Sequence, residues 1–173
     1  TGVNPFINVG ASGSLSDGSF EILAGATAST LFLNVGRNGG TGTMLIDGAG
    51  TTLTQSGVGV NQAAPPGPGQ SGSNGAAGAS IGRNIGGGGG TGSVTVSNGA
   101  QWLISDGGGD GRTAQNSPAI TLGRGANSSG SLTITGAGSR VQIDATSLGL
   151  APGVADNYNP FFAVGYDNPS TTS

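Results

Sequence analysis

A short alternating apolar motif that ends in glycine recurs five times along this chain, and it constrains the possible folds more than any other feature. The copies are Phe6-Ile7-Asn8-Val9-Gly10, Phe32-Leu33-Asn34-Val35-Gly36, Ala79-Ser80-Ile81-Gly82, Ile120-Thr121-Leu122-Gly123 and Phe162-Ala163-Val164-Gly165. Repeats of roughly 20–50 residues are typical of solenoids, in which each unit stacks on its neighbours. Other elements in register with this motif should then belong to the same structural unit.

A second motif follows the first four copies, whereas the fifth copy reaches Ser173 without one. Its copies are Gly18-Ser19-Phe20-Glu21-Ile22, Gly42-Thr43-Met44-Leu45-Ile46, Gly92-Ser93-Val94-Thr95-Val96 and Gly130-Ser131-Leu132-Thr133-Ile134. Counting seven positions past the last apolar residue of this motif predicts a third strand with its buried residue at Leu53, Leu103 and Val141. In the first unit the count reaches Ser29, and we expect burial to shift to Leu31 there.

The units differ in length. Successive first motifs lie 26, 46, 41 and 42 positions apart, counted between Val9, Val35, Ile81, Leu122 and Val164. The shortest unit therefore has 26 residues, and the longer ones carry insertions at 62–78, 106–118 and 147–160. Their Gly, Pro, Ser, Asn and Ala content is typical of exposed loops. We treat residues 1–173 as a single segment, and the absence of a starting Met and of a second motif after the fifth copy suggests a longer parent chain.

Alternation with a period of two places Leu33 and Val35 on one face of a strand and Asn34 on the other. Three such strands cannot bury their apolar faces alone, so equivalent strands of successive units should pair in parallel. We therefore predict an all-β parallel β-helix of about four to five coils, with the motif glycines at corners that need a positive φ. A sandwich or propeller is the alternative, because Asp47-Gly48 and Asn98-Gly99 are typical of hairpins. These pairs recur in register with the 26-residue unit, so we interpret them as corners.

Composition removes several classes of function. The chain has 38 glycines, no lysine, no histidine and no cysteine, and its net charge is −3. Zinc fingers, Ser-His-Asp or Cys-His catalysis and disulfide frameworks are excluded. Nothing indicates a cationic face for nucleic acid, and no apolar run approaches the roughly 20 residues of a membrane helix. We expect no nucleic-acid partner and no membrane insertion of this segment.

The repeat itself resembles a known family. The string from Val35 to Leu53, and the second copy formed by Leu122-Gly123-Arg124-Gly125 and residues 129–138, resemble the glycine-rich repeat of autotransporter (type V secretion) passenger regions. Similar repeats occur in bacterial exoproteins with a C-terminal sorting signal. The resemblance implies a right-handed β-helix, secreted or displayed on the bacterial outer membrane surface, often as an adhesin or biofilm component. The long insertions depart from the short repeat of that family and leave the role of the loops open.

Three arginines follow corner glycines in successive units, namely Arg37, Arg83 and Arg124. Stacking should place them in one column, which is repulsive unless carboxylates, carbonyls or an anion accept their N–H groups. One interpretation is a site for a small anion or an acidic glycan. The other, which we favour at this stage, is that each guanidinium donates to corner carbonyls and that Tyr166 covers one of them.

Two further groups are candidate sites. We expect Trp102 to face outward beside Arg140 on the next coil, where the indole could stack on a sugar ring or pack beneath the 106–118 insertion. Asp106 and Asp110, in a glycine-rich loop, could bind Ca²⁺, act as an acid/base pair on a glycoside, or simply form a solvated turn, which we favour.

The sequence therefore predicts a structural scaffold without catalysis and without a required cofactor, which mediates adhesion or matrix assembly and self-associates through coil ends or side faces. Its partners would be surface glycans or host and matrix molecules. A carbohydrate-binding or carbohydrate-active protein is the alternative. The outward threonines Thr95, Thr121 and Thr133 raise ice binding as a third, less favoured possibility, because their columns are irregular.

Overall fold

The computed structural model describes residues 6–11, 16–56, 77–84, 88–105, 118–144 and 160–165. These residues form strands, turns and bends, with no helix among them. The strands are β1 (Phe6–Ala11), β2 (Asp17–Leu23), β3 (Thr27–Thr30), β4 (Phe32–Arg37), β5 (Thr41–Asp47), β6 (Thr52–Ser56), β7 (Gly78–Arg83), β8 (Thr91–Ser97), β9 (Gln101–Ser105), β10 (Ala119–Arg124), β11 (Ser129–Thr135), β12 (Arg140–Asp144) and β13 (Phe161–Val164). The predicted all-β class is confirmed for this part of the chain.

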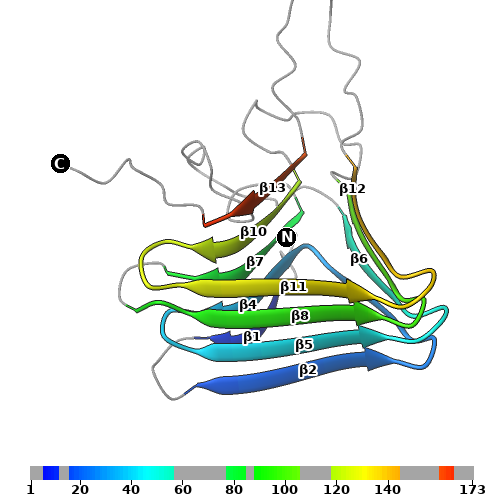
Figure 1. Ribbon diagram of the computed structural model, residues 1–173, viewed down its shortest axis with the longest axis horizontal. Helices are drawn as coiled ribbons and strands as arrows, with labels where there is room; N and C mark the ends of the chain where they lie inside the picture. The colour runs from blue at the N-terminus through cyan, green and yellow to red at the C-terminus, as the bar shows by residue number, and fades with distance from the viewer. Residues whose placement is uncertain are drawn as a thin grey trace, which may run out of the picture.

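The strands form three parallel sheets that the chain visits in rotation (Figure 1). Sheet A has the order β1-β4-β7-β10-β13, sheet B the order β11-β8-β5-β2, and sheet C the order β12-β9-β6-β3. We call three consecutive strands, one from each sheet, a rung: β1–β3, β4–β6, β7–β9 and β10–β12. Every strand pairs only with its equivalents in adjacent rungs, which is compatible with the predicted stacking of repeat units.

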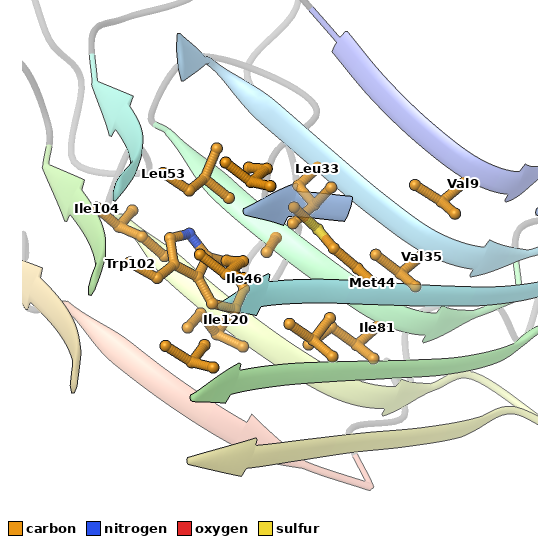
Figure 2. Close-up of a cluster of buried hydrophobic side chains, with 14 of the residues drawn as sticks. Val9, Leu33, Val35, Met44, Ile46, Leu53, Ile81, Trp102, Ile104 and Ile120 are labelled. Atoms are coloured by element: carbon orange, nitrogen blue, oxygen red, sulfur yellow. The ribbon is translucent and has the colours of Figure 1, made fainter. Parts of the chain in front are cut away.

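The register of sheets A and B is the one that the two motifs predict. In sheet A the first-motif residues Val9, Val35, Ile81, Leu122 and Val164 pair in succession. In sheet B the second-motif residues Ile22, Ile46, Val96 and Ile134 do the same. Except for Ile134 and Val164 at the last strands, these side chains fill the space between the three sheets together with Leu33, Met44 and Leu53 (Figure 2). The motifs therefore encode the apolar core directly.

The corner glycines after sheet A adopt the predicted positive φ, with values from 61° to 69°. Gly36 shows a second requirement, because a Cβ there would collide with the main-chain carbonyl of Thr91 in the next rung. At Gly165, after the last strand of sheet A, no atom lies within 4 Å of the corresponding position. The corner thus needs glycine for its dihedral angle everywhere, and for space where another rung is stacked on it.

The corners between sheets B and C alternate in length. Leu53 lies seven positions after Ile46, whereas Trp102 lies only six after Val96, and yet Leu53 and Trp102 pair. The shorter corner turns through Asn98 and Gly99, both with positive φ, and closes with the Ala100 amide donating to the Ser97 carbonyl at 3.1 Å. The uniform count of seven is therefore wrong in the third rung.

Hydroxyl groups of the longer corners bond to the shorter corners beside them. Thr51 Oγ1 accepts a hydrogen bond from the Gly25 amide at 2.9 Å, and Ser139 Oγ accepts one from the Gly99 amide at 2.9 Å. The same two hydroxyls donate to carbonyls of their own corners. The same hydroxyl-to-amide contact thus joins the first corner to the second and the third corner to the fourth.

Sheet A is buried on both faces in its inner strands, unlike sheets B and C. All residues of β4 from Phe32 to Gly36 are buried, whereas β5 alternates between buried and more exposed positions. Thr121 on β10, expected on the outer surface, is fully buried, and its Oγ1 lies 3.2 Å from Ser80 Oγ. The expectation of an exposed threonine is therefore wrong at Thr121.

The predicted insertions lie largely outside the described residues. Gly78, assigned to the first insertion, is the first residue of β7 and pairs with Phe32 and Ala119. Pro118 is buried directly before β10, and Pro160 is exposed before β13.

Candidate functional site

Three arginines form a ladder at the end of sheet A, where the chain turns toward sheet B. Arg37 ends β4, Arg83 ends β7 and Arg124 ends β10. Arg37 pairs with Arg83, and Arg83 pairs with Arg124, so the predicted column is confirmed. In the first rung the same position is Ala11. We call Arg37, Arg83 and Arg124 the arginine ladder.

The main chain fixes the arginine ladder in place. The amide of Asn38 donates to the Arg83 carbonyl at 2.8 Å, and the amide of Asn84 donates to the Arg124 carbonyl at 2.8 Å. Asn38 has a positive φ of 52°, which asparagine tolerates better than most residues. Each corner is therefore bonded to the arginine of the next rung, so the three Cα atoms keep the spacing of neighbouring strands.

The side chains of the ladder are more buried than a surface fan of arginines would be. Arg83 is only 8% exposed and Arg124 only 6%, while Arg37 is partly buried. The Nε atoms of Arg37 and Arg83 are buried and have no hydrogen-bond partner among the described residues. The favoured interpretation, donation by every guanidinium to corner carbonyls, therefore fails for these two Nε groups.

Burial changes the acid–base chemistry of Arg83. Loss of hydration, followed by the positive charges of Arg124 and Arg37, lowers the pKa of Arg83 from its ordinary value to about 9. All three causes act in the same direction, since each disfavours the protonated guanidinium. Even so, a group with this pKa carries its charge at neutral pH. The centre of the ladder is thus a buried cation that no carboxylate of the described residues pairs with.

Two of the described carboxylates, Asp47 and Asp144, lie away from the arginine ladder. Asp47 accepts hydrogen bonds from Ser97 Oγ and, at 2.8 Å, from Asn98 Nδ2 at the corner between sheets B and C. Asp144 accepts one from Gln142 Nε2 at 2.6 Å on sheet C. No group of three or more metal-ligating residues is found in the part of the chain that the structure describes. Asp106, Asp110 and Tyr166, which the sequence singled out, lie outside that part.

Trp102 is not the exposed stacking platform that the sequence suggested. It is fully buried in the core, where it pairs between Leu53 and Val141 (Figure 2). Its Nε1 donates to Gln55 Oε1 at 2.8 Å. The one-residue shorter corner before β9 turns Trp102 inward and leaves Leu103 partly exposed, reversing the expected faces.

Gln55 is a buried polar residue that the sequence analysis missed. Besides accepting from Trp102, its Nε2 donates to the carbonyls of Leu31 at 3.2 Å and Gly78 at 2.9 Å. It thus joins sheet C to the chain entering sheet A. The sequence could have predicted this burial, because Gln55 lies two positions after the buried Leu53 and therefore on the same face of β6.

Arg140 does not lie opposite Trp102. It pairs with Gln101, and its Nη2 donates to Gln101 Oε1 at 3.1 Å on the exposed face of sheet C. The prediction of an outward-facing Trp102 beside Arg140 is therefore wrong. Arg140 instead provides a solvent-exposed arginine to compare with the buried ones.

The two ends of the stack differ. At the end formed by β11, β12 and β13, Ile134 is 48% exposed and Val164 is 71% exposed, although both belong to core columns. At the opposite end, formed by β1, β2 and β3, the core residues Val9 and Ile22 are buried, while Phe6 and Leu23 are exposed. The end that contains β13 thus presents apolar core positions to solvent.

Comparisons with family models, with curated proteins and with solved structures find no match to this chain. Within the described ranges, no helix is long and apolar enough to cross a membrane.

Proposed function

We propose that this chain is part of a secreted or surface-displayed bacterial scaffold, folded as a right-handed parallel β-helix of about four to five coils. Its work would be mechanical and non-catalytic: adhesion or assembly of an extracellular matrix, as the resemblance to autotransporter passengers implies. The observation that carries the proposal is the exposure of Ile134, Phe162 and Val164 at the end that contains β13. These residues occupy columns that are buried in every inner rung.

An exposed rung end is a surface built for a further rung. The outer edges of β11, β12 and β13 leave main-chain amides and carbonyls without a sheet partner, because each is the last strand of its sheet. The opposite edge, formed by β1, β2 and β3, offers the complementary row. A further strand on sheet A would extend the column of Ile7 over Phe162, and a further strand on sheet B would extend the column of Ile22 over Ile134.

Such a contact joins two different ends of the molecule, so it does not close on itself. A head-to-tail interface of this kind generates open filaments rather than symmetric dimers. Continuation by further repeats of a longer chain would use the same surface. Both forms of stacking suit a protein whose task is to extend a rigid rod or to link copies into a matrix.

Self-association tests the proposal. Sedimentation velocity over a wide concentration range should show a series of growing assemblies for the unmodified chain. Ile134→Asp, which places a charge on the end surface, should shift the chain toward the monomer. Thr43→Asp, on an exposed position of an inner strand, is the matched control and should leave the assemblies intact.

Adhesion needs its own measurement. Beads or cells that display the chain should clump or adhere to a surface more than those that display Ile134→Asp. A chain that stays monomeric at every concentration and confers no adhesion would contradict the proposed scaffold. Release of reducing sugar from polysaccharides by the unmodified chain would contradict its non-catalytic character.

A further inference from the structure

We propose that the arginine ladder is a binding site for a small oxyanion such as inorganic sulfate or phosphate, held by the guanidinium groups of Arg37, Arg83 and Arg124. This site is separate from the rung end on which the proposed function depends. It involves sheet A at the corner that leads into sheet B, and it would bind an ion whether or not the chain associates.

The geometry supplies three cations at a fixed spacing. Adjacent strands lie about 4.8 Å apart, and the strand pairing places Arg83 between Arg37 and Arg124. Like charges on directly paired positions destabilise a sheet. Main-chain hydrogen bonds from Asn38 and Asn84 hold the corner carbonyls of Arg83 and Arg124, so the backbone cannot easily separate the charges. An anion between the guanidinium groups would turn this repulsion into attraction.

The donors that such an anion would use are present and unsatisfied. Arg83 is more than nine-tenths buried, and its Nε has no hydrogen-bond partner among the described residues. The buried Nε of Arg37 is in the same condition. A buried donor without a partner is costly, and more so when it belongs to a charged group. Two such donors on neighbouring strands indicate that a ligand with acceptor oxygens would stabilise this part of the fold.

The charge state of the site agrees with this assignment. Burial and the neighbouring guanidinium groups lower the pKa of Arg83 to about 9, so Arg83 remains cationic at neutral pH at a cost to the fold. A bound anion would oppose all three causes and raise this pKa again. Arginine also suits the task, because its planar fork can donate two parallel hydrogen bonds to an oxyanion.

Burial restricts what can bind. With Arg83 and Arg124 less than one-tenth exposed, a polymer backbone such as a nucleic acid or an acidic polysaccharide cannot reach both guanidinium groups. A compact ion carrying two negative charges can neutralise most of the ladder while filling little volume. We therefore commit to a free inorganic oxyanion rather than to a charged group on a large molecule.

Binding is measured by titrating the intact chain with sodium sulfate, and separately with sodium phosphate, at constant ionic strength set with sodium chloride. Calorimetry should show saturable binding in the millimolar range or tighter. Thermal unfolding should shift upward by about 5–10 °C when the anion is at roughly 100 times its Kd. The general stabilising effect of sulfate at such concentrations is measured by titrating Arg83→Met under the same conditions and is subtracted.

Two variants locate the site. Arg83→Met, which keeps length and removes charge, should abolish the anion-dependent shift, and Arg37→Met should weaken binding at least tenfold. Arg140→Met removes an exposed arginine of sheet C and should keep the full shift, which makes it the matched control. If Arg83→Met failed to fold, Arg37→Met would still test the assignment, because Arg37 is less buried.

Several outcomes would overturn the site. One is an equal shift with sodium chloride alone, since screening and not binding would then relieve the repulsion. Another is retention of the sulfate effect by both Arg83→Met and Arg37→Met. A sulfated oligosaccharide that binds as well as free sulfate, and that needs Arg83, would overturn the commitment to a free ion.

Discussion

The inner rungs and the rung end at β11–β13 are built from the same motifs but have different environments. Ile46 and Ile134 occupy the same column of sheet B, yet Ile46 is fully buried and Ile134 is 48% exposed. Val35 and Val164 in sheet A differ in the same way, from no exposure to 71%. At the β11–β13 end, burial of these apolar columns thus depends on a further rung.

This comparison also separates the two ends. Val9 and Ile22 belong to the first rung and are nevertheless buried, so the end at β1–β3 covers its core better than the end at β11–β13 does. The two ends of the stack are therefore not equivalent. In a head-to-tail contact, burial of the β11–β13 end should therefore contribute more to association than burial of the β1–β3 end, because it removes more apolar surface from water.

The sharpest way to break the comparison is to place the same charge at both positions. Ile46→Asp buries an unpaired carboxylate between rungs and should abolish cooperative unfolding or cost more than about 4 kcal/mol. Ile134→Asp should cost less than about 1 kcal/mol in dilute, monomeric protein, because solvent reaches that position. Urea unfolding followed by circular dichroism measures both. Equal costs would show that the end is covered in solution.

A second test compares the two neighbours Trp102 and Val141 on sheet C. Trp102→Ala should destabilise the chain by about 3–5 kcal/mol, because it opens a cavity and leaves Gln55 Oε1 without its donor. Val141→Ala, in the last rung, should cost about 1 kcal/mol or less, since Val141 is only partly buried. Thermal unfolding distinguishes the two. A nearly neutral Trp102→Ala would mean that the indole lies on the surface after all.

Arg83 and Arg140 also compare a buried with an exposed position, but here we expect the substitution at the buried position to stabilise the chain. In anion-free buffer, Arg83→Met should stabilise the chain by about 1–4 kcal/mol, because it removes a buried and poorly compensated charge. Arg140→Met should change stability by no more than about 0.5 kcal/mol, since that side chain is exposed. Urea midpoints in buffer free of sulfate and phosphate check this. Destabilisation by Arg83→Met would show that its charge is already neutralised within the chain.

The pH dependence gives the smallest effect. The folded-state pKa of Arg83 is about 9 and lies well below the ordinary pKa that the guanidinium has in the unfolded chain, so above about pH 9 the unfolded chain binds more protons. The unfavourable contribution of Arg83 is complete below pH 9 and is relieved as pH rises above it. The stability advantage of Arg83→Met should therefore shrink between about pH 9 and pH 10.5. A constant difference over this window would contradict the lowered pKa.

Much of the architecture was predictable because local patterns carry it. The spacing of Val9, Val35, Ile81 and Leu122 gave the register of sheet A, and the glycines after them gave the positive-φ corners. The register of sheet C was harder to predict from the sequence, because the corner between sheets B and C alternates in length. One residue fewer before β9 reverses the faces of Trp102 and Leu103, since side chains alternate along a strand.

For the candidate site, the sequence alone determined that three arginines stand in one column, since the corner glycine before each sets the register. It also determined which strand faces are apolar. Only the tertiary structure decided that Arg83 is buried with an unpaired Nε, that sheet A is covered on both faces, and that one end of the stack is open. The reason is physical: alternation and corner chemistry are local, whereas desolvation, charge compensation and burial depend on which chain segments lie alongside.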